Sequence, residues 1–304
     1  MLLDLRRRLA DIPFDARAWR DLGRAAPDLN AFRRSLAVLS EDADVHAELA
    51  AAMLTGGSHR NADRPIRRSL TTAPDRADLW QLAAHQAYSV RLPRTAIRFA
   101  HRALAADPGF DIAHRTLGAA HLLENNLLEG FAAFRVADRS IQSLPLPIWS
   151  GEPPEGRAIV VVGEEGFGDM IQMARFLPAL ADRGAVVTVV VPQQLSRLLA
   201  SIPGVTTVVG VSPEAFAFWV PLMALPQLLG VSRVDGRPYL RAPSSGPRLA
   251  SSEDLTVGMA WRGRKAHPND ARRSLDLGSI ARLLSTPGVR FVSLDPSEAP
   301  SPML

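Results

Sequence analysis

The sequence of 304 residues contains no cysteine. A chain without cysteine cannot form disulfides, thiolate metal sites or a cysteine nucleophile. Lysine is almost absent too: Lys265 is the single one, so nearly all of the 35 basic residues are arginines. They are interspersed with 31 acidic residues and leave a formal net charge of only +4. We therefore expect neither a nucleic-acid-binding stripe nor a polybasic membrane anchor.

Long apolar runs are also missing. No window approaches the roughly 18 apolar residues of a membrane-spanning helix. The N-terminal segment MLLDLRRRLADIPFDARAW has neither the apolar stretch nor the small-residue cleavage site of a secretory signal. The seven histidines show no metal-ligand spacing. We expect a cytoplasmic globular protein of two domains, without a bound metal.

The first half of the chain repeats with a period of 34 residues. The aligned positions are bulky (His46, Trp80, His114), mostly large and apolar (Leu49, Ala83, Leu117), small (Ala50, Ala84, Gly118 and Ala62, Ala96, Gly130) or proline (Pro74, Pro108). Small side chains let two antiparallel helices pack closely, and a proline stops the second helix. The pattern resembles the tetratricopeptide repeat.

Three repeat units fit between residues 43 and 142. Trp19 and Gly23 indicate a further unit ahead of them, which must be short or irregular because Trp19 lies only 27 residues before His46. Asp residues 44, 78 and 111 fall where an N-cap would begin each first helix. Residues 1–146 are therefore predicted to form a helical solenoid. Its concave face would bind a protein partner or acceptor.

Strands and helices alternate after the proline-rich boundary at 143–149. We expect strands at 158–162, 186–191, 205–209 and 216–220, and helices at 170–182, 192–201 and 222–229. This alternation predicts a parallel sheet with helices on both faces, in a lobe spanning 147–242. Residues 243–304 are interpreted as a linker and an incomplete second α/β lobe, with strands at 256–261 and 290–294 around a helix at 277–285, followed by a Pro/Ser tail.

A glycine-rich turn stands in the most informative segment, residues 158–172. An apolar strand leads into Gly163, Gly166 and Gly168, and Asp169 then opens a helical pattern. Such a turn brings backbone N–H groups and a helix dipole to bear on a ligand. The spacing matches neither the dinucleotide fingerprint nor a P-loop. Glutamates at 164 and 165 would repel a phosphate group, so we do not expect an anionic ligand on this loop.

Several motifs follow one another in order: Trp149–Glu152, Gly163–Gln172, Arg175–Pro178, Pro238–Leu240, Trp261–Gly263, His267–Asp270 and the pair Arg273 and Ser274. Together they resemble bacterial tetratricopeptide-repeat proteins with a glycosyltransferase-like C-terminal region, similar to heptosyltransferases and, more distantly, to O-linked N-acetylglucosamine transferases. The resemblance covers about residues 43–294. It implies a GT-B architecture of two Rossmann-like lobes, with the acceptor on the first, a nucleotide-sugar donor on the second, and no metal or other cofactor.

The resemblance also implies roles for individual residues. Asp169 would be the catalytic base toward an acceptor hydroxyl, on a loop completed by Gly163, Gly166, Gly168 and Gln172. The alternative is that Asp169 is simply a helix N-cap. After the strand at 256–261, the candidates for binding the donor diphosphate are Arg262, Lys265, Asn269, Arg273 and Ser274, because cations there can neutralise a leaving group. The alternative is a solvated basic loop.

The second lobe is short for such a family. Only residues 255–304 follow the linker, whereas a whole lobe needs on the order of 100–150 residues. We expect the donor half to be largely missing and the chain to be a truncated relative. Two functions stay open: sugar transfer to a protein or glycan acceptor, lost if the donor lobe is incomplete, or a non-catalytic protein-interaction module with a vestigial α/β domain.

Overall fold

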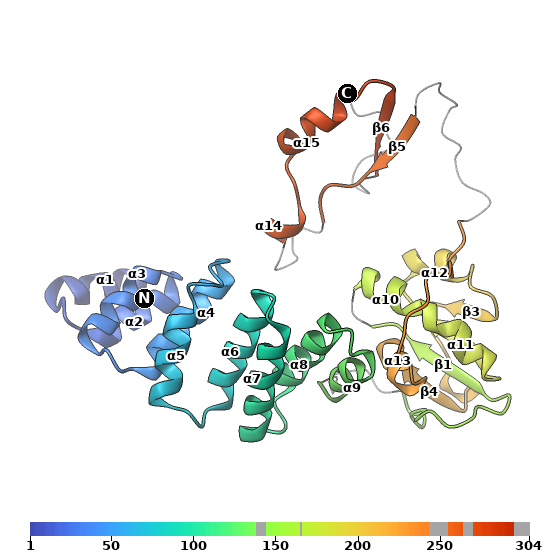
Figure 1. The fold of residues 1–304 in the computed structure, drawn as a ribbon, viewed down its shortest axis with the longest axis horizontal. Helices are drawn as coiled ribbons and strands as arrows, with labels where there is room; N and C mark the ends of the chain where they lie inside the picture. The colour runs from blue at the N-terminus through green and yellow to red at the C-terminus, as the bar shows by residue number, and fades with distance from the viewer. Residues whose placement is uncertain (138–143, 165, 243–254, 264–269, 295–304) are drawn as a thin grey trace. The chain divides into compact units, whose positions relative to one another are not determined.

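The computed structural model describes residues 1–137, 144–164, 166–242, 255–263 and 270–294. Contacts divide the chain into two compact units, Met1–Pro243 and Ser244–Leu304. The described part of the first unit is a run of helices followed by a parallel sheet, and that of the second is a strand pair with its helices (Figure 1). None of the helices in these ranges has the length and apolar character that a membrane crossing requires.

The helical part is a tetratricopeptide-like solenoid, as predicted. Its helices are α1 (Leu2–Asp11), α2 (Ala16–Ala25), α3 (Leu29–Val38), α4 (Ala43–Thr55), α5 (Asp63–Thr72), α6 (Ala77–Ser89), α7 (Pro93–Ala106), α8 (Asp111–Leu123) and α9 (Leu127–Ala137). The pairs α4–α5, α6–α7 and α8–α9 coincide with the three predicted units. The pair α2–α3 is the shorter unit before them, with helices of 10 residues each.

The small residues of the repeat bring paired helices together. Ala50 and Ala62 are fully buried, as are Ala84 and Ala96 one unit later. In the third unit, a Cβ on Gly118 would lie 2.8 Å from the carbonyl oxygen of Gly130. Any larger residue at position 118 would therefore force α8 and α9 apart, which explains the glycine there.

The turns inside the units repeat as closely as the helices. Gly57, Arg91 and Asn125 stand 34 residues apart and all have positive φ angles, of 79°, 64° and 62°. The next N–H in each turn bonds back into the first helix, as from Leu92 to the Ala87 carbonyl at 2.9 Å. This left-handed ending favours glycine. The sequence therefore varies at a position where the backbone does not.

The prediction that Asp44, Asp78 and Asp111 are N-caps is wrong. The caps of α4, α6 and α8 are Asp42, Arg76 and Phe110, and the three aspartates lie in the first helical turns. A carboxylate in the first turn still interacts favourably with the helix dipole. Aspartate is therefore favourable both at the N-cap and in the first turn, and the residue type alone did not distinguish these two positions.

The sheet of the first unit is parallel, with strand order β3-β2-β1-β4. Its elements are β1 (Ala158–Val162), α10 (Phe167–Met173), η1 (Ala174–Phe176), α11 (Leu177–Asp182), β2 (Val186–Val190), α12 (Gln193–Leu199), β3 (Val205–Val208), η2 (Pro213–Ala215), β4 (Phe218–Pro221), η3 (Leu222–Ala224) and α13 (Leu225–Leu228). The predicted single helix at 170–182 is instead broken and begins earlier, at Phe167. Pro178 explains the break, because it lacks an N–H and disfavours helical backbone before it.

The solenoid and the sheet share a core. Phe131 of α9 is buried with Ile159, Val161 and Val189 of the sheet. Its ring lies edge-on to Phe176, with centroids 6.4 Å apart. The last repeat helix is thus packed directly against the α/β part.

The second unit is small. Strands β5 (Leu255–Met259) and β6 (Val289–Ser293) pair in parallel, and α14 (Asp270–Arg273) and α15 (Leu277–Leu284) connect them. Trp261, Ile280 and Phe291 are buried in it.

Candidate functional site

Close packing explains one of the glycines in the loop after β1. The N–H of Gly163 donates to the Val190 carbonyl at 2.9 Å. A Cβ on Gly163 would lie 2.8 Å from the sulfur of Met170 and 2.9 Å from that same carbonyl. Gly168 has no such neighbour within 4 Å. Packing therefore requires glycine at position 163 and not at position 168.

Asp169 is the third residue of α10, whose N-cap is Gly166. Its Oδ2 accepts a hydrogen bond of 3.2 Å from the Gly166 N–H. Asp169 thus stabilises the helix start without being the N-cap, which corrects the simple capping alternative. Its side chain is exposed, as is that of Gln172 one turn further on. Residues three apart share a helix face, so these two predicted site residues stand together.

Glu164 fills an anion position at the sheet edge. The strand order reverses between β1 and β4, and ligands of open α/β sheets bind beyond the carboxyl ends of strands at such a point. There the two carboxylate oxygens of Glu164 accept hydrogen bonds from the N–H groups of Leu222 and Met223, at 2.9 and 2.8 Å. An anionic ligand cannot use these two N–H groups while Glu164 holds them. Glu165 lies outside the described residues.

Two of the sequence motifs meet at α10. The Arg175 guanidinium lies 4.9 Å from the centre of the Tyr239 ring. The Tyr239 hydroxyl donates to the Ile171 carbonyl at 2.8 Å. The segment that follows α13 is thereby fastened to the helix that carries Asp169, a contact that sequence reasoning did not predict.

In the second unit, Ser274 makes hydrogen bonds to the described residues on both sides of the predicted donor loop. Its Oγ accepts from the Gly263 N–H at 2.9 Å and donates to Asp270 at 2.5 Å. Arg262 lies 5.7 Å from the Trp261 ring centre, and the Arg273 guanidinium would be 4.0 Å from a Cβ on Gly263. Three candidates, Arg262, Arg273 and Ser274, thus gather around Gly263. The other two, Lys265 and Asn269, lie outside the described residues.

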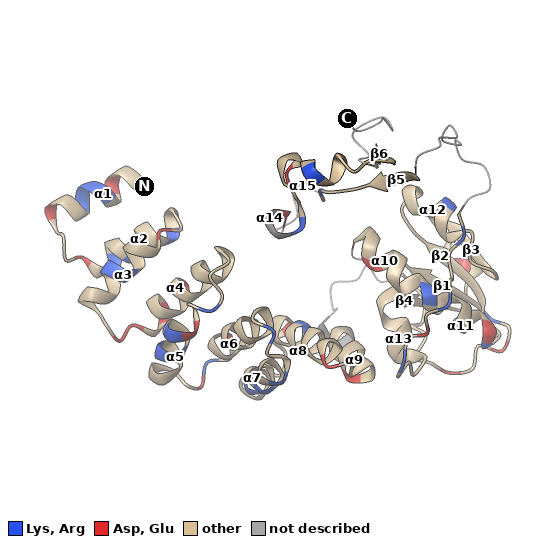
Figure 2. Ribbon diagram, turned by 45° about the horizontal axis from the view of Figure 1, so that its top comes forward, with Lys and Arg blue, Asp and Glu red and all other residues tan. Residues whose placement is uncertain are grey.

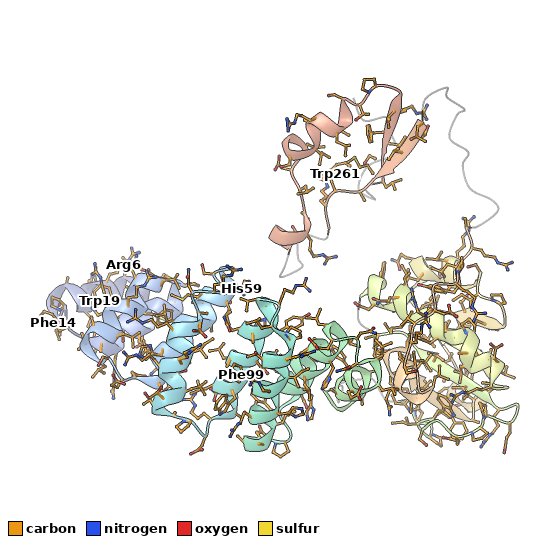
Figure 3. All side chains as sticks on the ribbon, in the orientation of Figure 1. Arg6, Phe14, Trp19, His59, Phe99 and Trp261 are labelled. Carbon is orange, nitrogen blue, oxygen red and sulfur yellow. The ribbon has the colours of Figure 1, made fainter. Side chains whose placement is uncertain are left out.

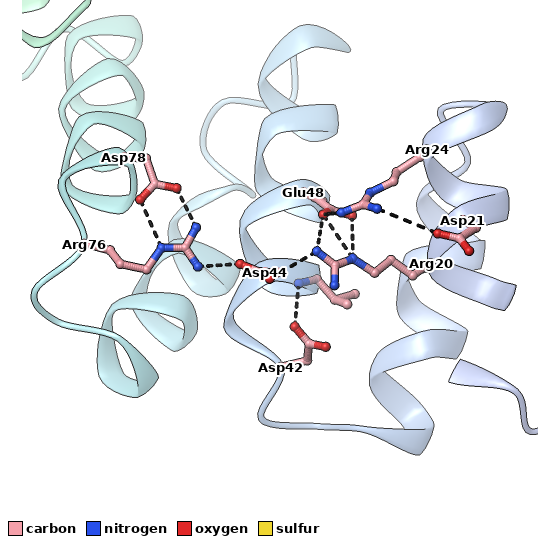
Figure 4. Close-up of polar contacts among 9 residues, drawn as sticks. Arg20, Asp21, Arg24, Asp42, Asp44, Glu48, Arg76 and Asp78 are labelled. Atoms are coloured by element: carbon pink, nitrogen blue, oxygen red, sulfur yellow. Dashed lines mark hydrogen bonds and ion pairs between the residues drawn. The ribbon is translucent and has the colours of Figure 1, made fainter. Parts of the chain in front are cut away.

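Ion pairs connect α2, α4 and α6, the first helices of three successive units (Figure 4). Arg20 of α2 lies 2.6 Å from Glu48 and 3.2 Å from Asp44, both on α4. Arg76 at the start of α6 pairs with Asp44 and, at 2.6 Å, with Asp78. Burial raises the pKa of Glu48, but hydrogen bonds from Arg20 and Arg24 outweigh it, so this pKa lies below its ordinary value. These charges therefore satisfy one another.

The bulky repeat position has a polar role that sequence reasoning missed. The indole N–H groups of Trp19 and Trp80 donate to the carbonyls six residues earlier, at 2.8 and 2.7 Å. The Nε2 atoms of His46 and His114 lie 2.8 and 3.0 Å from the equivalent carbonyls. Both Trp and His carry a ring nitrogen that can make this bond, and their alternation at one position was the available signal.

Two grooves open between successive units, at equivalent positions. The larger one, of about 1130 Å³, lies between α5 and α7 over α6, and the smaller one, of about 590 Å³, lies one unit earlier. Most lining positions of the smaller groove recur 34 residues later in the larger one. The recurring pairs include Arg33/Arg67, Leu36/Leu70, His46/Trp80, Leu49/Ala83, Met53/Ala87 and Arg64/Arg98.

Each groove combines an apolar floor with an arginine rim. In the larger groove the rings of Trp80 and Phe99 lie 5.7 Å apart, and Phe99 is seen on α7 in Figure 3. Arg60, Arg67 and Arg98 line the groove around these rings. The blue on α5 in Figure 2 is arginine, because this helix contains no lysine. The sequence predicted a partner on the concave face of the solenoid and named no residues there, and that prediction stays untested. The larger groove is lined by residues of α5, α6 and α7.

No protein-family model matches the chain, and no curated protein is significantly similar to it. Several solved structures resemble it at low identity. MamA from Desulfovibrio magneticus is 17% identical with a TM-score of 0.44, over 47% of this chain and 86% of MamA. YrrB, described as a TPR protein with an unusual peptide-binding site, is 16% identical with a TM-score of 0.38, over 44% of this chain and 74% of YrrB.

An O-GlcNAc transferase from Thermobaculum terrenum is 15% identical with a TM-score of 0.37, over 57% of this chain and 36% of the transferase. Such low identities and TM-scores carry no argument about activity or partners. What the structure itself establishes is a tetratricopeptide-like helical solenoid followed by a small parallel sheet region.

Proposed function

We propose that the chain is a protein-interaction module whose solenoid binds a peptide segment of a partner. One observation carries the proposal: the recurrence of an open, apolar-floored groove at equivalent positions of two successive units. A concave apolar site with a few charged groups at its edge is the usual form of a binding site. The surface formed by α2, α4 and α6 is a weaker candidate for binding, because the charged side chains there already pair with one another.

The test is a selection of random peptides displayed on phage against the full chain, followed by affinity measurement of the enriched peptides. Thr95→Trp would place a large ring over the larger groove and should weaken them about tenfold or more. Thr72→Trp, at an exposed site that lines neither groove, is the matched control. A library that yields no binder, or binders insensitive to Thr95→Trp, would contradict the proposal.

Sugar transfer is the second function that we put forward, for the α/β part. It is supported by the exposed Asp169 carboxylate, on the helix that follows β1, beside the point where the strand order reverses. The acceptor hydroxyl would give its proton to Asp169 while its oxygen bonds to the anomeric carbon. The nucleoside diphosphate would leave with the electrons of the broken C–O bond. Arg262 and Arg273 are the described cations proposed for the donor.

Asp169→Asn separates the catalytic reading from the structural one. Asn can still accept from the Gly166 N–H, so the free energy of unfolding should fall only by the charge–dipole interaction, about 0.3–1 kcal/mol. Asp169→Ala should cost about 1 kcal/mol more, the net contribution of one hydrogen bond. A catalytic base would be lost in both variants, because an amide cannot take the proton. The readout is nucleoside diphosphate release from a panel of nucleotide sugars with acceptor present. No turnover by the unsubstituted chain, or full turnover by Asp169→Asn, would refute this second function.

A further inference from the structure

The larger groove differs from the smaller one by an aromatic wall. In the 34-residue register, Ala83 and Ala87 stand where the preceding unit carries Leu49 and Met53, and Phe99 stands where it carries Pro65. Both alanines are buried, with 3% and 1% of their surface exposed, and Phe99 packs against the apolar clusters that contain them. The small residues thus make room for the Phe99 ring, which lines the groove.

The accessible walls of the groove are apolar. Trp80 and Phe99 are half-buried and in ring contact, and Leu70 faces the groove from α5. Leaving aromatic and aliphatic surface in contact with water is unfavourable in free energy. A concave patch of such surface is therefore typical of a place where a ligand binds. The volume of about 1130 Å³ is ample for one leucine or aromatic side chain together with the backbone that carries it.

The arginines at the rim of the groove indicate the charge of the peptide that binds there. Arg67 pairs with Asp63 at 2.9 Å, with both side chains largely exposed. Arg60 and Arg98 line the same groove, and within the described ranges no carboxylate pairs with either of them. Guanidinium groups bind carboxylates with two-point geometry. The rim is therefore complementary to a negatively charged chain.

We infer that the groove between α5 and α7 binds an acidic peptide segment, whose single bulky apolar side chain packs against the half-buried rings of Trp80 and Phe99. Carboxylates on either side of this anchor face Arg60 and Arg98. The inference rests on the proposed interaction function and adds to it the chemistry of the partner.

Labelled nine-residue peptides test this chemistry by fluorescence anisotropy with the full chain. The host sequence is made of Glu, Asp, Ser and Gly with a central Leu, Phe or Ala, and a second host carries Lys in place of the acids. The acidic peptides with central Leu or Phe should bind about tenfold or more tightly than the one with Ala. Their affinity should fall with added salt, and the Lys host should not bind.

Two kinds of variant locate the site. Thr95→Trp, at a half-buried position that lines the groove, should weaken the Leu peptide about tenfold or more. Thr72→Trp, at an exposed site that lines neither groove, is its control. Arg98→Glu, which is exposed and leaves the floor intact, should abolish binding of the acidic peptide and allow the Lys host to bind.

Equal binding of the Leu and Ala peptides, or unchanged binding in folded Thr95→Trp and in Arg98→Glu, overturns the inference. Groove-dependent binders from the phage selection that are basic or lack a bulky residue overturn it as well, yet leave the interaction function standing. A selection without binders removes both.

Discussion

Trp149→Ala is expected to lower the free energy of unfolding of the sheet region by about 3–5 kcal/mol, the usual cost of truncating a buried aromatic side chain. Trp149 is fully buried and is the largest side chain so enclosed. Its backbone N–H donates to the Trp219 carbonyl at 2.9 Å, and its indole N–H donates to the Glu152 carbonyl, also at 2.9 Å. It therefore docks the segment that leaves the solenoid onto the edge beside β4.

Hydrogen–deuterium exchange of the β1 and β2 amides is the measurement, because it reports this region separately from the repeats. Trp149→Phe keeps most of the apolar contact and gives up the indole hydrogen bond, so it should cost clearly less than the alanine variant. A loss below about 1 kcal/mol in Trp149→Ala would show that the segment is not anchored there.

Glu164→Ala should cost about 2–3 kcal/mol. The substitution removes both acceptors of the Leu222 and Met223 N–H groups, and a hydrogen bond to a charged group contributes about 1.5–3 kcal/mol. Glu164→Gln retains one acceptor oxygen and turns an amide N–H₂ toward the second donor, so its cost should be intermediate. Glu214→Ala, at an exposed acidic position of the same region, should change stability by no more than about 0.5 kcal/mol.

Urea denaturation followed by circular dichroism, read beside exchange of the β4 amides, compares these three variants. If Glu164→Ala and Glu214→Ala were equally stable, the two hydrogen bonds would carry no net energy. The carboxylate at the strand-order reversal would then have to be explained by ligand binding rather than by folding.

The repeat was predictable because its signal is local. Small residues at a fixed period, such as Ala50 and Ala84, constrain how two adjacent helices pack whatever the rest of the chain does. The parallel arrangement of β1 to β4 followed equally from short alternating segments. Boundaries were less secure: Asp44 suits a cap and a first turn equally well, and the effect of Pro178 on the preceding residues was not anticipated.

The sites were harder, because they depend on contacts between distant positions. Glu164 could be read only as a negative charge, since its partners Leu222 and Met223 come 58 and 59 residues later. Alanine at 83 and 87 was visible in the repeat alignment, but only the packing shows that the Phe99 ring lies against the clusters that contain them. The catalytic role of Asp169 and the donor roles of Arg262, Lys265, Asn269, Arg273 and Ser274 stay predictions.

The larger groove, between α5 and α7, lies where α5 meets α6, and this junction affects how the solenoid unfolds. Stability in repeat arrays is a sum over units and the interfaces between neighbours, and cooperativity depends on those interfaces. Ala83 and Ala87 present smaller side chains at this junction than Leu49 and Met53 do at the preceding one. We therefore expect the array to unfold as a block that ends with α5 and a block that begins with α6, the latter held to the sheet through Phe131 and Phe176. A peptide seated in the groove would bridge the two blocks and merge two unfolding transitions into one.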